Sequence, residues 1–358
     1  MKTTDISTIS QRFFILNLFV KDTNKLTLSI LFNVFGYFSL FPSFSFLSCT
    51  IEYTIYLPGN GRGFFQHYGY WALFATAPIL ILLTLFLIDK LIFLTSNISK
   101  FITEAEVPPP LKNKIEKSLN SLALRTKTKY IFYLFQIIGL LGSIANIVNT
   151  IKPKGIYGND VYDSFSYFWG FLSGKFFLSF IWIFVYPTVF FIIYHVSWTM
   201  LDILRHLYQK QILFIDFFNK DNCGGVSIFG LINFIIVSIY MNIIIVLFAL
   251  SITHANNYPT LVLSIGFVSI LSISHSFYGV YYVQKIVKDK KNEYLDSINL
   301  ELNKRVKNLK SFSQDLIFLR NHILSVKTYP YTRFISFFIN TFRISSGIIT
   351  LIKIWSPV

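Results

Sequence analysis

Long stretches without any charged residue are the feature that most constrains this chain. Uncharged stretches cover 26 residues after Lys25, 26 after Arg62, 22 after Lys129, 26 after Lys175 and 63 after Asp221. About 20 apolar residues in a helix are enough to cross the hydrocarbon core of a bilayer. Only 14% of all residues are charged, against about 25% in ordinary soluble domains. The chain is therefore predicted to be an integral membrane protein.

The uncharged stretches predict an all-α polytopic protein with about six transmembrane helices. Helices are expected because lipid offers no partner to unpaired backbone groups. The longest stretch must hold two spans, since its middle segment 254–259, His-Ala-Asn-Asn-Tyr-Pro, is typical of a turn. The predicted spans cover roughly 26–47, 68–88, 130–151, 176–200, 226–252 and 260–282.

The basic residues are distributed unevenly between the predicted loops. The chain has 32 Lys and Arg against 17 Asp and Glu, a net charge of +15. Of the 32 basic residues, 28 lie in alternate segments, namely 1–25, 89–129, 201–225 and 283–358. Cytoplasmic loops retain Lys and Arg, so we expect both termini in the cytoplasm of a bacterial inner membrane. The weakest point is a tie, because 152–175 and 201–225 hold three basic residues each. The excess charge thus records orientation, and no nucleic acid partner is expected.

Three regions follow from this topology. Residues 1–25 form a cytoplasmic N-terminal segment, 26–283 the six-span domain and 284–358 a cytoplasmic helical extension. Within the membrane domain, an amphipathic cytoplasmic helix is predicted at about 111–128, because apolar residues recur at helical spacing between lysines (Leu111, Ile115, Leu119 and Leu122). We expect this helix to lie on anionic lipid headgroups; the alternative is a regulatory element coupled to the third span.

The C-terminal region shows a heptad-like pattern. Apolar residues step by three or four at Leu295, Ile298, Leu302, Val306, Leu309, Phe312, Leu316, Leu319 and Ile323. Residues 285–327 are therefore predicted to form one long helix or a helical hairpin that joins subunits into a homo-oligomer. Packing within one chain is the alternative. Segment 334–354 is long enough to span but has Arg343 at its centre, so an amphipathic helix is favoured over a seventh span.

Motifs for catalysis are absent from the sequence. There is no phosphate-binding loop, no H-E-x-x-H, no G-x-S-x-G and no kinase set. The two cysteines, Cys49 and Cys223, lack zinc-ligand spacing. We therefore predict no catalytic residue and no cofactor, and we leave a metal ion open.

Polar residues inside spans are the candidate functional positions, because lipid makes them costly. His195, Asp202 and His206 share one face of the fourth span with Trp198. Asp202 and His206, four residues apart, can bind a cation or pass protons; the alternative is a solvated interfacial cluster. The fifth span adds Asn233 and Asn242, and the sixth adds His275. These residues are predicted to line a pore or a ligand site, although hydrogen bonding between helices is commoner.

The loop before the fifth span carries a second candidate. Asp221 is followed by Gly224 and Gly225, where positive φ angles let backbone N–H groups converge on an anion. The alternative is a tight turn with a capping aspartate. Asp-x-x-Gly-Gly resembles a cytoplasmic loop motif in a group of uncharacterised bacterial polytopic membrane proteins. Those proteins usually carry His-Pro before the motif, whereas this chain has Asn219-Lys220. The resemblance covers about five residues and implies no activity.

These observations predict a membrane channel or pore-like protein, for example an effector gated from the cytoplasmic side. Two other classes stay open. A secondary transporter would use broken helices, and Pro42, Pro78 and Pro187 are placed to interrupt spans. A membrane-embedded, metal-dependent enzyme would gather His195, Asp202, His206 and Asp221 around an ion.

Overall fold

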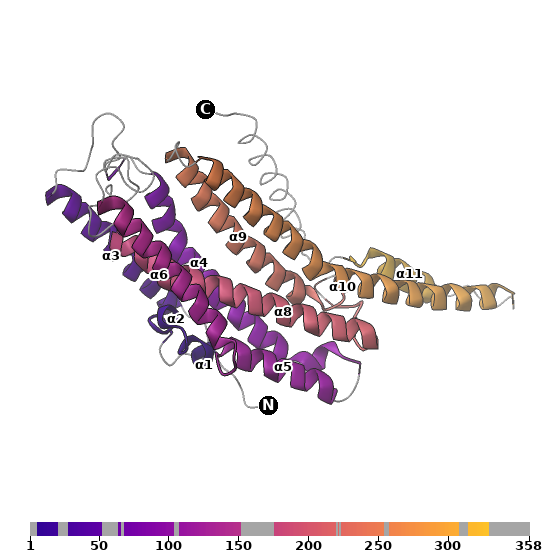
Figure 1. The fold of residues 1–358 in the computed structure, drawn as a ribbon. Helices are drawn as coiled ribbons and strands as arrows, with labels where there is room; N and C mark the ends of the chain where they lie inside the picture. The colour runs from indigo at the N-terminus through magenta and orange to yellow at the C-terminus, as the bar shows by residue number, and fades with distance from the viewer. Residues whose placement is uncertain are drawn as a thin grey trace.

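The computed structural model describes residues 6–20, 28–51, 64–65, 68–103, 107–151, 175–219, 221, 223–253, 258–307 and 314–328. These residues form helices and no strand, which confirms the all-α prediction. The long helices are α3 (Leu28–Ile51), α4 (Tyr68–Ser96), α6 (Lys129–Ile151), α8 (Tyr186–Lys210), α9 (Ser227–Thr253) and α10 (Tyr258–Lys307). The shorter ones are α1 (Ile6–Ser10), α2 (Phe14–Asn17), the 3-10 turn η1 (Ile98–Phe101), α5 (Pro109–Leu122), α7 (Lys175–Phe180), the π-helix η4 (Ile181–Val185) and α11 (Gln314–Ser325). Figure 1 shows the long helices gathered into a bundle.

Five helical stretches of the described chain are long and apolar enough to cross a membrane. They are Leu28–Ile51, Gly69–Ser96, Phe176–Lys210, Ser227–Ala249 and Leu263–Arg305. The third of these runs through α7, η4 and α8 without a break. The remaining predicted span corresponds to α6, where Lys129–Ile144 is counted as a shorter apolar helix.

A short backbone pairing is consistent with α6 as a sixth span. The amide of Thr103, after α4, donates to the carbonyl of Ile212, after α8, at 2.8 Å, and the amide of Phe214 donates to Phe101 O at 3.0 Å. The ends of α4 and α8 therefore lie on one side of the membrane. Since α7–α8 returns the chain to that side, the chain must leave it between Thr103 and α7. The long apolar helix in this interval is α6, so six spans fit. The same pairing places 201–225 on the side of 89–129.

The centre of the bundle is α9, which packs along both α4 and α10. Its sequence is apolar on all sides, as expected for a helix surrounded by protein or lipid. Five of its large side chains are fully buried: Phe229, Ile232, Ile235, Ile236 and Ile239. This helix therefore supplies the common core against which the spans around it are placed.

Aromatic rings fix the N-terminal helices to the bundle. The Phe13 ring lies 5.1 Å from Phe132 of α6 and 5.8 Å from Phe191 of α8, between ring centroids. The Phe14 ring lies 4.9 Å from Phe184 of η4. Residues 6–20, within the predicted cytoplasmic segment, are thus packed onto the transmembrane helices.

The apolar stripe of α5 faces protein rather than lipid. Its four members, Leu111, Ile115, Leu119 and Leu122, are all buried, and α5 packs on α8. The expected contact of this stripe with lipid headgroups is therefore replaced by contact with a span. Three lysines on the other faces of α5 are exposed (Lys112, Lys114 and Lys117), and their contact with anionic headgroups stays a prediction.

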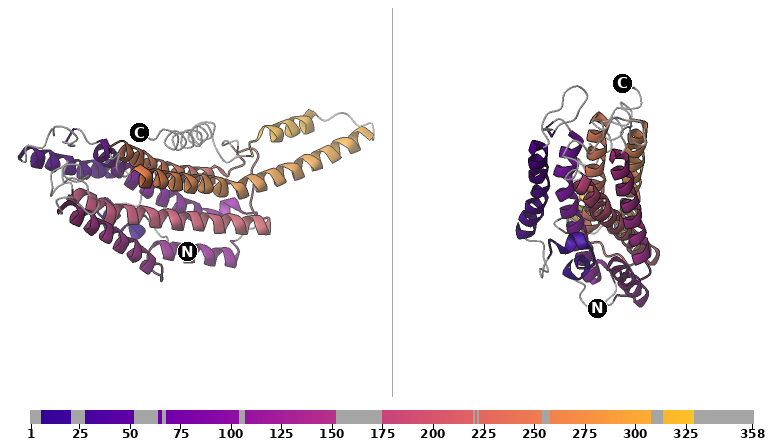
Figure 2. Two further views of the ribbon diagram at one scale, coloured as in Figure 1. Left: turned by 45° about the horizontal axis from the view of Figure 1, so that its top comes forward. Right: turned by 60° about the vertical axis from the view of Figure 1, so that its left-hand side comes forward.

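The heptad-like residues whose side chains the structure describes pack within one chain, whereas Val306, Leu309 and Phe312 lie outside this described set. Helix α10 continues beyond the other spans to Lys307, and α11 returns along it (Figures 1 and 2). The Lys291 ammonium donates to the carbonyls of Leu324 and Val326, both at 2.8 Å, and Arg320 Nε donates to Asn299 Oδ1 at 3.2 Å. Heptad-like residues of both helices are buried or join the core (Leu295, Ile298, Leu302, Leu316, Leu319 and Ile323). Homo-oligomerisation through 285–327 stays a prediction, and 334–354 lies outside the described residues.

The hairpin is held against the loop between α8 and α9. The His322 Nε2 donates to the carbonyl of Phe217 at 2.9 Å. The imidazole also stacks on Phe218, with ring centroids 4.7 Å apart and planes 8° from parallel. The segments after α4, α8 and α10 therefore meet at one end of the bundle.

Candidate functional site

The loop Asp221-x-Cys-Gly-Gly closes on its own aspartate. Asp221 Oδ1 accepts the amides of Cys223 at 2.8 Å and Gly225 at 3.0 Å, while Oδ2 accepts the amide of Ser227 at 3.3 Å. Both glycines have positive φ, +74° at Gly224 and +83° at Gly225. The amides do converge on an anion, but that anion is the Asp221 carboxylate. This geometry matches the capping turn, and it leaves these three amides occupied.

Cys223 is buried beside this turn. Burial, with a smaller contribution from the Asp221 carboxylate, raises the pKa of its thiol to about 11, and Lys327 acts in the opposite direction. The thiol therefore stays protonated near neutral pH. Since the thiolate is the nucleophile and metal ligand, Cys223 is suited to packing rather than to catalysis.

The polar stripe of the fourth span is divided between two environments. His195 and His206 are buried, whereas Trp198 is 59% exposed. The His195 ring contacts Phe191, with centroids 4.4 Å apart, and Tyr194, at 5.2 Å. No group of three His, Cys, Asp or Glu side chains comes together among the described residues. Asp202 and His206 thus receive no third ligand there.

The polar residues of the fifth and sixth spans make mostly local contacts. His275 Nδ1 lies 3.0 Å from the carbonyl of Leu271 and 3.3 Å from the hydroxyl of Tyr240, which joins α10 to α9. The Asn242 amide donates to Ser238 O of its own helix at 2.8 Å. Asn233 is fully buried on α9. The contacts described above do not join His195 or Asp202 to Asn242 or His275.

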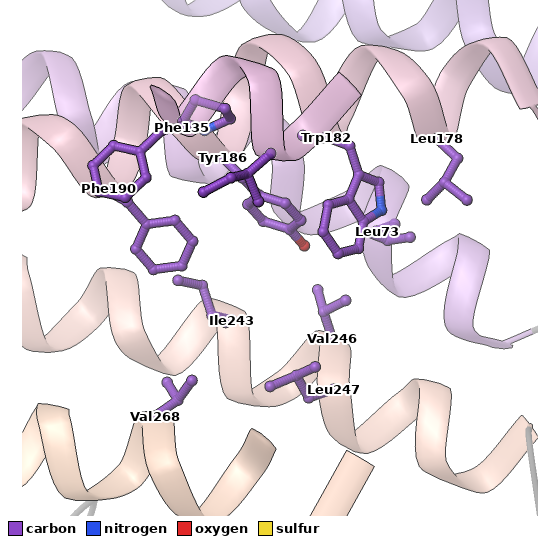
Figure 3. Close-up of a pocket in the computed structure, with 13 residues that line it drawn as sticks. Leu73, Phe135, Leu178, Trp182, Tyr186, Phe190, Ile243, Val246, Leu247 and Val268 are labelled. Atoms are coloured by element: carbon purple, nitrogen blue, oxygen red, sulfur yellow. The ribbon is translucent and has the colours of Figure 1, made fainter. Parts of the chain in front are cut away.

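An apolar cavity lies between the described spans. Its volume is about 360 Å³, within the range of about 300 to 1,000 Å³ typical of small-molecule sites. The lining comes from seven of the helical elements described above, α4, α6, α7, η4, α8, α9 and α10. Its residues are Leu73, Phe135, Ile138, Gly139, Leu178, Trp182, Tyr186, Pro187, Phe190, Ile243, Val246, Leu247 and Val268. Ile138 and Trp182 are 52% and 41% exposed, so the cavity opens at these two residues. Figure 3 shows its walls.

One wall is an aromatic row built on the π-helix. Trp182, Tyr186 and Phe190 follow each other along η4 and α8, with neighbouring centroids 6.1 Å apart in each pair. The amide of Tyr186 donates to Ile181 O, five residues earlier. Pro187 follows directly and has no N–H to donate. The proline therefore explains why the helix widens here, as π-turns in α-helices frequently do at functional sites.

The aromatic row is positioned by a close contact between the backbones of α6 and η4. A Cβ atom at Gly139 of α6 would overlap the carbonyl oxygen of Trp182 and lie 2.9 Å from its carbonyl carbon. The hydrogen of Gly139 takes that position instead and points at the oxygen, the arrangement of a weak Cα–H···O bond. At Gly142 a Cβ atom would meet the Trp182 ring at 3.4 Å. The two glycines thus hold both the backbone and the indole of Trp182.

Sequence reasoning missed this cavity because its lining is apolar. Residues that face a cavity and residues that face lipid have the same composition in a span, so hydropathy does not separate them. The available signal was Pro187, which was noted only as a possible interruption. Pro42 and Pro78, noted with it, lie inside α3 and α4, which continue through them.

Substitution of Gly139 tests the backbone contact. In Gly139→Ala, the new methyl group should force α6 away from η4 and destabilise the protein by about 1–3 kcal/mol, the usual cost of overpacking. Thermal unfolding in detergent measures the effect. Gly142→Ala is the matched control, because its methyl group meets only the Trp182 ring at ordinary contact distance. Equal stability of the two variants would contradict the contact.

Substitution of Gly224 tests the turn. Gly224→Ala should cost about 1–3 kcal/mol of unfolding free energy, because φ is +74° and the Cβ atom would lie 2.6 Å from Ile215 Cγ2. Gly36→Ala in α3 is the control, since its Cβ atom meets nothing within 4 Å. It should be neutral or stabilising by up to about 1 kcal/mol. A Gly224→Ala protein as stable as the parent would exclude a strained turn.

No protein-family model, no curated protein and no solved structure matches the chain.

Proposed function

We propose that this membrane protein is a transport protein for a hydrophobic molecule, which it takes up from the bilayer into the cavity between α4, α6, α7, η4, α8, α9 and α10. The observation that carries the proposal is the cavity itself, about 360 Å³ in volume and lined by apolar and aromatic side chains. Of its exposed lining residues, Trp182 belongs to a candidate span and Ile138 to the shorter apolar helix Lys129–Ile144. A ligand that enters there comes from lipid rather than from water.

The π-helix within the fourth span supports transport over simple storage. Binding sites of secondary transporters are typically built where a transmembrane helix is broken. Here Pro187 and the π-helix Ile181–Val185 interrupt the helical hydrogen bonding beside the cavity. A segment with weakened backbone pairing can change conformation at smaller cost than a regular helix. This feature favours the transporter hypothesis among the functions predicted from the sequence.

An ion channel is less well supported by the same residues. Ion pathways use backbone carbonyls, charged rings or hydrophobic gates along a wet pore. The lining of this cavity carries no charged side chain. The predicted pore residues Asn242 and His275 bond to their own helices. The channel hypothesis is therefore tested separately, by measuring potassium flux through the protein in liposomes.

The proposal places the protein in a bacterial inner membrane with both termini in the cytoplasm. Support comes from the 28 of 32 basic residues in alternate segments. It also comes from the pairing of Phe101 with Phe214, which puts two of these segments on one side. The positive-inside rule then identifies that side as cytoplasmic.

Photolabelling tests ligand uptake. The full chain in nanodiscs is irradiated with a dodecyl chain that carries a diazirine, and labelled peptides are mapped by mass spectrometry. We expect saturable labelling of the cavity walls that excess dodecane suppresses. Val246→Phe fills the cavity and should lower this labelling about fivefold or more, because Val246 is 1% exposed. Ile245→Phe is the matched control, since Ile245 is 49% exposed, and it should change nothing.

Two results would overturn the proposal. One is labelling spread over lipid-facing residues such as Leu134 and Leu141, with no suppression by dodecane. The other is potassium flux through the protein in liposomes that Val246→Phe leaves unchanged, which would favour a channel elsewhere in the bundle.

Reporter fusions test the orientation. Fusions after Lys100 and after Lys310 should both report the cytoplasm, and a fusion after Arg62 should report the opposite side. The reason is the alternation of basic segments across six spans. Alkaline phosphatase and a fluorescent protein that matures only in the cytoplasm give complementary signals. Fusions after Lys100 and Lys310 that report opposite sides would contradict the six-span topology.

A further inference from the structure

One side chain makes the apolar cavity selective. The hydroxyl of Tyr186 points into the open space between Trp182 and Val246 (Figure 3). No hydrogen bond joins it to another described residue; its contacts there are the edge-on Trp182 ring and the Phe190 ring. Leaving a hydroxyl without a partner in an apolar environment costs about 1–3 kcal/mol. A ligand that offers an acceptor oxygen would remove this cost.

The chemistry of the lining narrows the ligand further. The polar side-chain groups among the lining residues are the Tyr186 hydroxyl and the Trp182 indole N–H, and both can donate. No lining side chain carries a charge that would neutralise an ionised head group. Burial of an unpaired charge is far more costly than burial of a neutral polar group. The site therefore disfavours carboxylates, phosphates and ammonium groups.

We infer that the cavity binds a neutral amphiphile, a hydrocarbon chain or ring system with a carbonyl, ether or hydroxyl oxygen, and that this oxygen accepts a hydrogen bond from Tyr186. The inference rests on the proposed function and names its substrate class. The oxygen lies between Trp182 and Val246, and the hydrocarbon part packs against the remaining walls. Tyr186 is then the residue that distinguishes such a ligand from a plain alkane or a lipid chain of the bilayer.

Competition experiments test the ligand class. Undecane, 2-undecanone and undecanoate compete with the diazirine chain for the protein in nanodiscs, and concentrations are corrected for partition into the bilayer. We expect the ketone to compete about five- to tenfold better than the alkane, the range that one hydrogen bond provides. Undecanoate should compete less well than the ketone. Tyr186→Phe should reduce competition by the ketone to the level of the alkane and leave the alkane unchanged.

The control variant is Tyr194→Phe on the same helix. Tyr194 is 53% exposed on the outside of the bundle, so the preference for the ketone should persist in this variant. Equal competition by ketone and alkane, with no effect of Tyr186→Phe, would overturn the inference and leave the proposed function standing. Stronger competition by undecanoate would also overturn it. Failure of every probe to compete would instead remove the proposed function.

Discussion

The contact between the backbones of α6 and η4 is the constraint on which the cavity depends. At η4 the amide of Tyr186 bonds to Ile181 O, and Pro187 has no N–H. The Trp182 carbonyl therefore loses both of the amides that would reach it in an α- or π-helical pattern. Lipid offers no replacement donor, and a neighbouring helix must approach closely instead. Gly139 permits that approach, because any larger residue would overlap the carbonyl oxygen.

The opposite side of the same segment is held by aromatic rings. Phe180 lies 6.1 Å from Tyr37 and 5.3 Å from Phe41 of α3, and Phe184 lies 4.9 Å from Phe14 of α2. Trp182 and Tyr186 meanwhile line the cavity. The π-helix is thus fixed between the N-terminal helices and the ligand site. A change in how residues 6–20 pack would therefore act on the cavity wall, although these residues do not line the cavity.

Composition and spacing were sufficient to predict the fold in outline. Uncharged stretches located the five helices that are long and apolar enough to cross a membrane, and the shorter apolar helix α6 as well, since a helix in lipid must be apolar over a fixed length. The extension beyond the sixth span and its helical hairpin also followed from spacing. The spacing of apolar residues did not identify the surface that each apolar face packs against. The stripe Leu111 to Leu122 packs on α8, and the heptad-like residues pack within the α10–α11 hairpin. An apolar helix face predicts that its side chains are buried, but it does not identify the surface that buries them.

The candidate site was predicted less well, because polarity within a span is a weak indicator of function. Short hydroxyl and amide side chains reach the carbonyl four residues earlier in their own helix. Thr84, Ser143 and Asn242 all do so, at 2.7, 3.0 and 2.8 Å. The polar groups of such side chains form their hydrogen bonds within their own helix at little cost. They need neither water nor a ligand as a partner. The Tyr186 hydroxyl differs, because the rigid ring carries it away from its own backbone and into the cavity. This hydroxyl is therefore found on an otherwise apolar wall, where a search for polar residues gives the weakest signal.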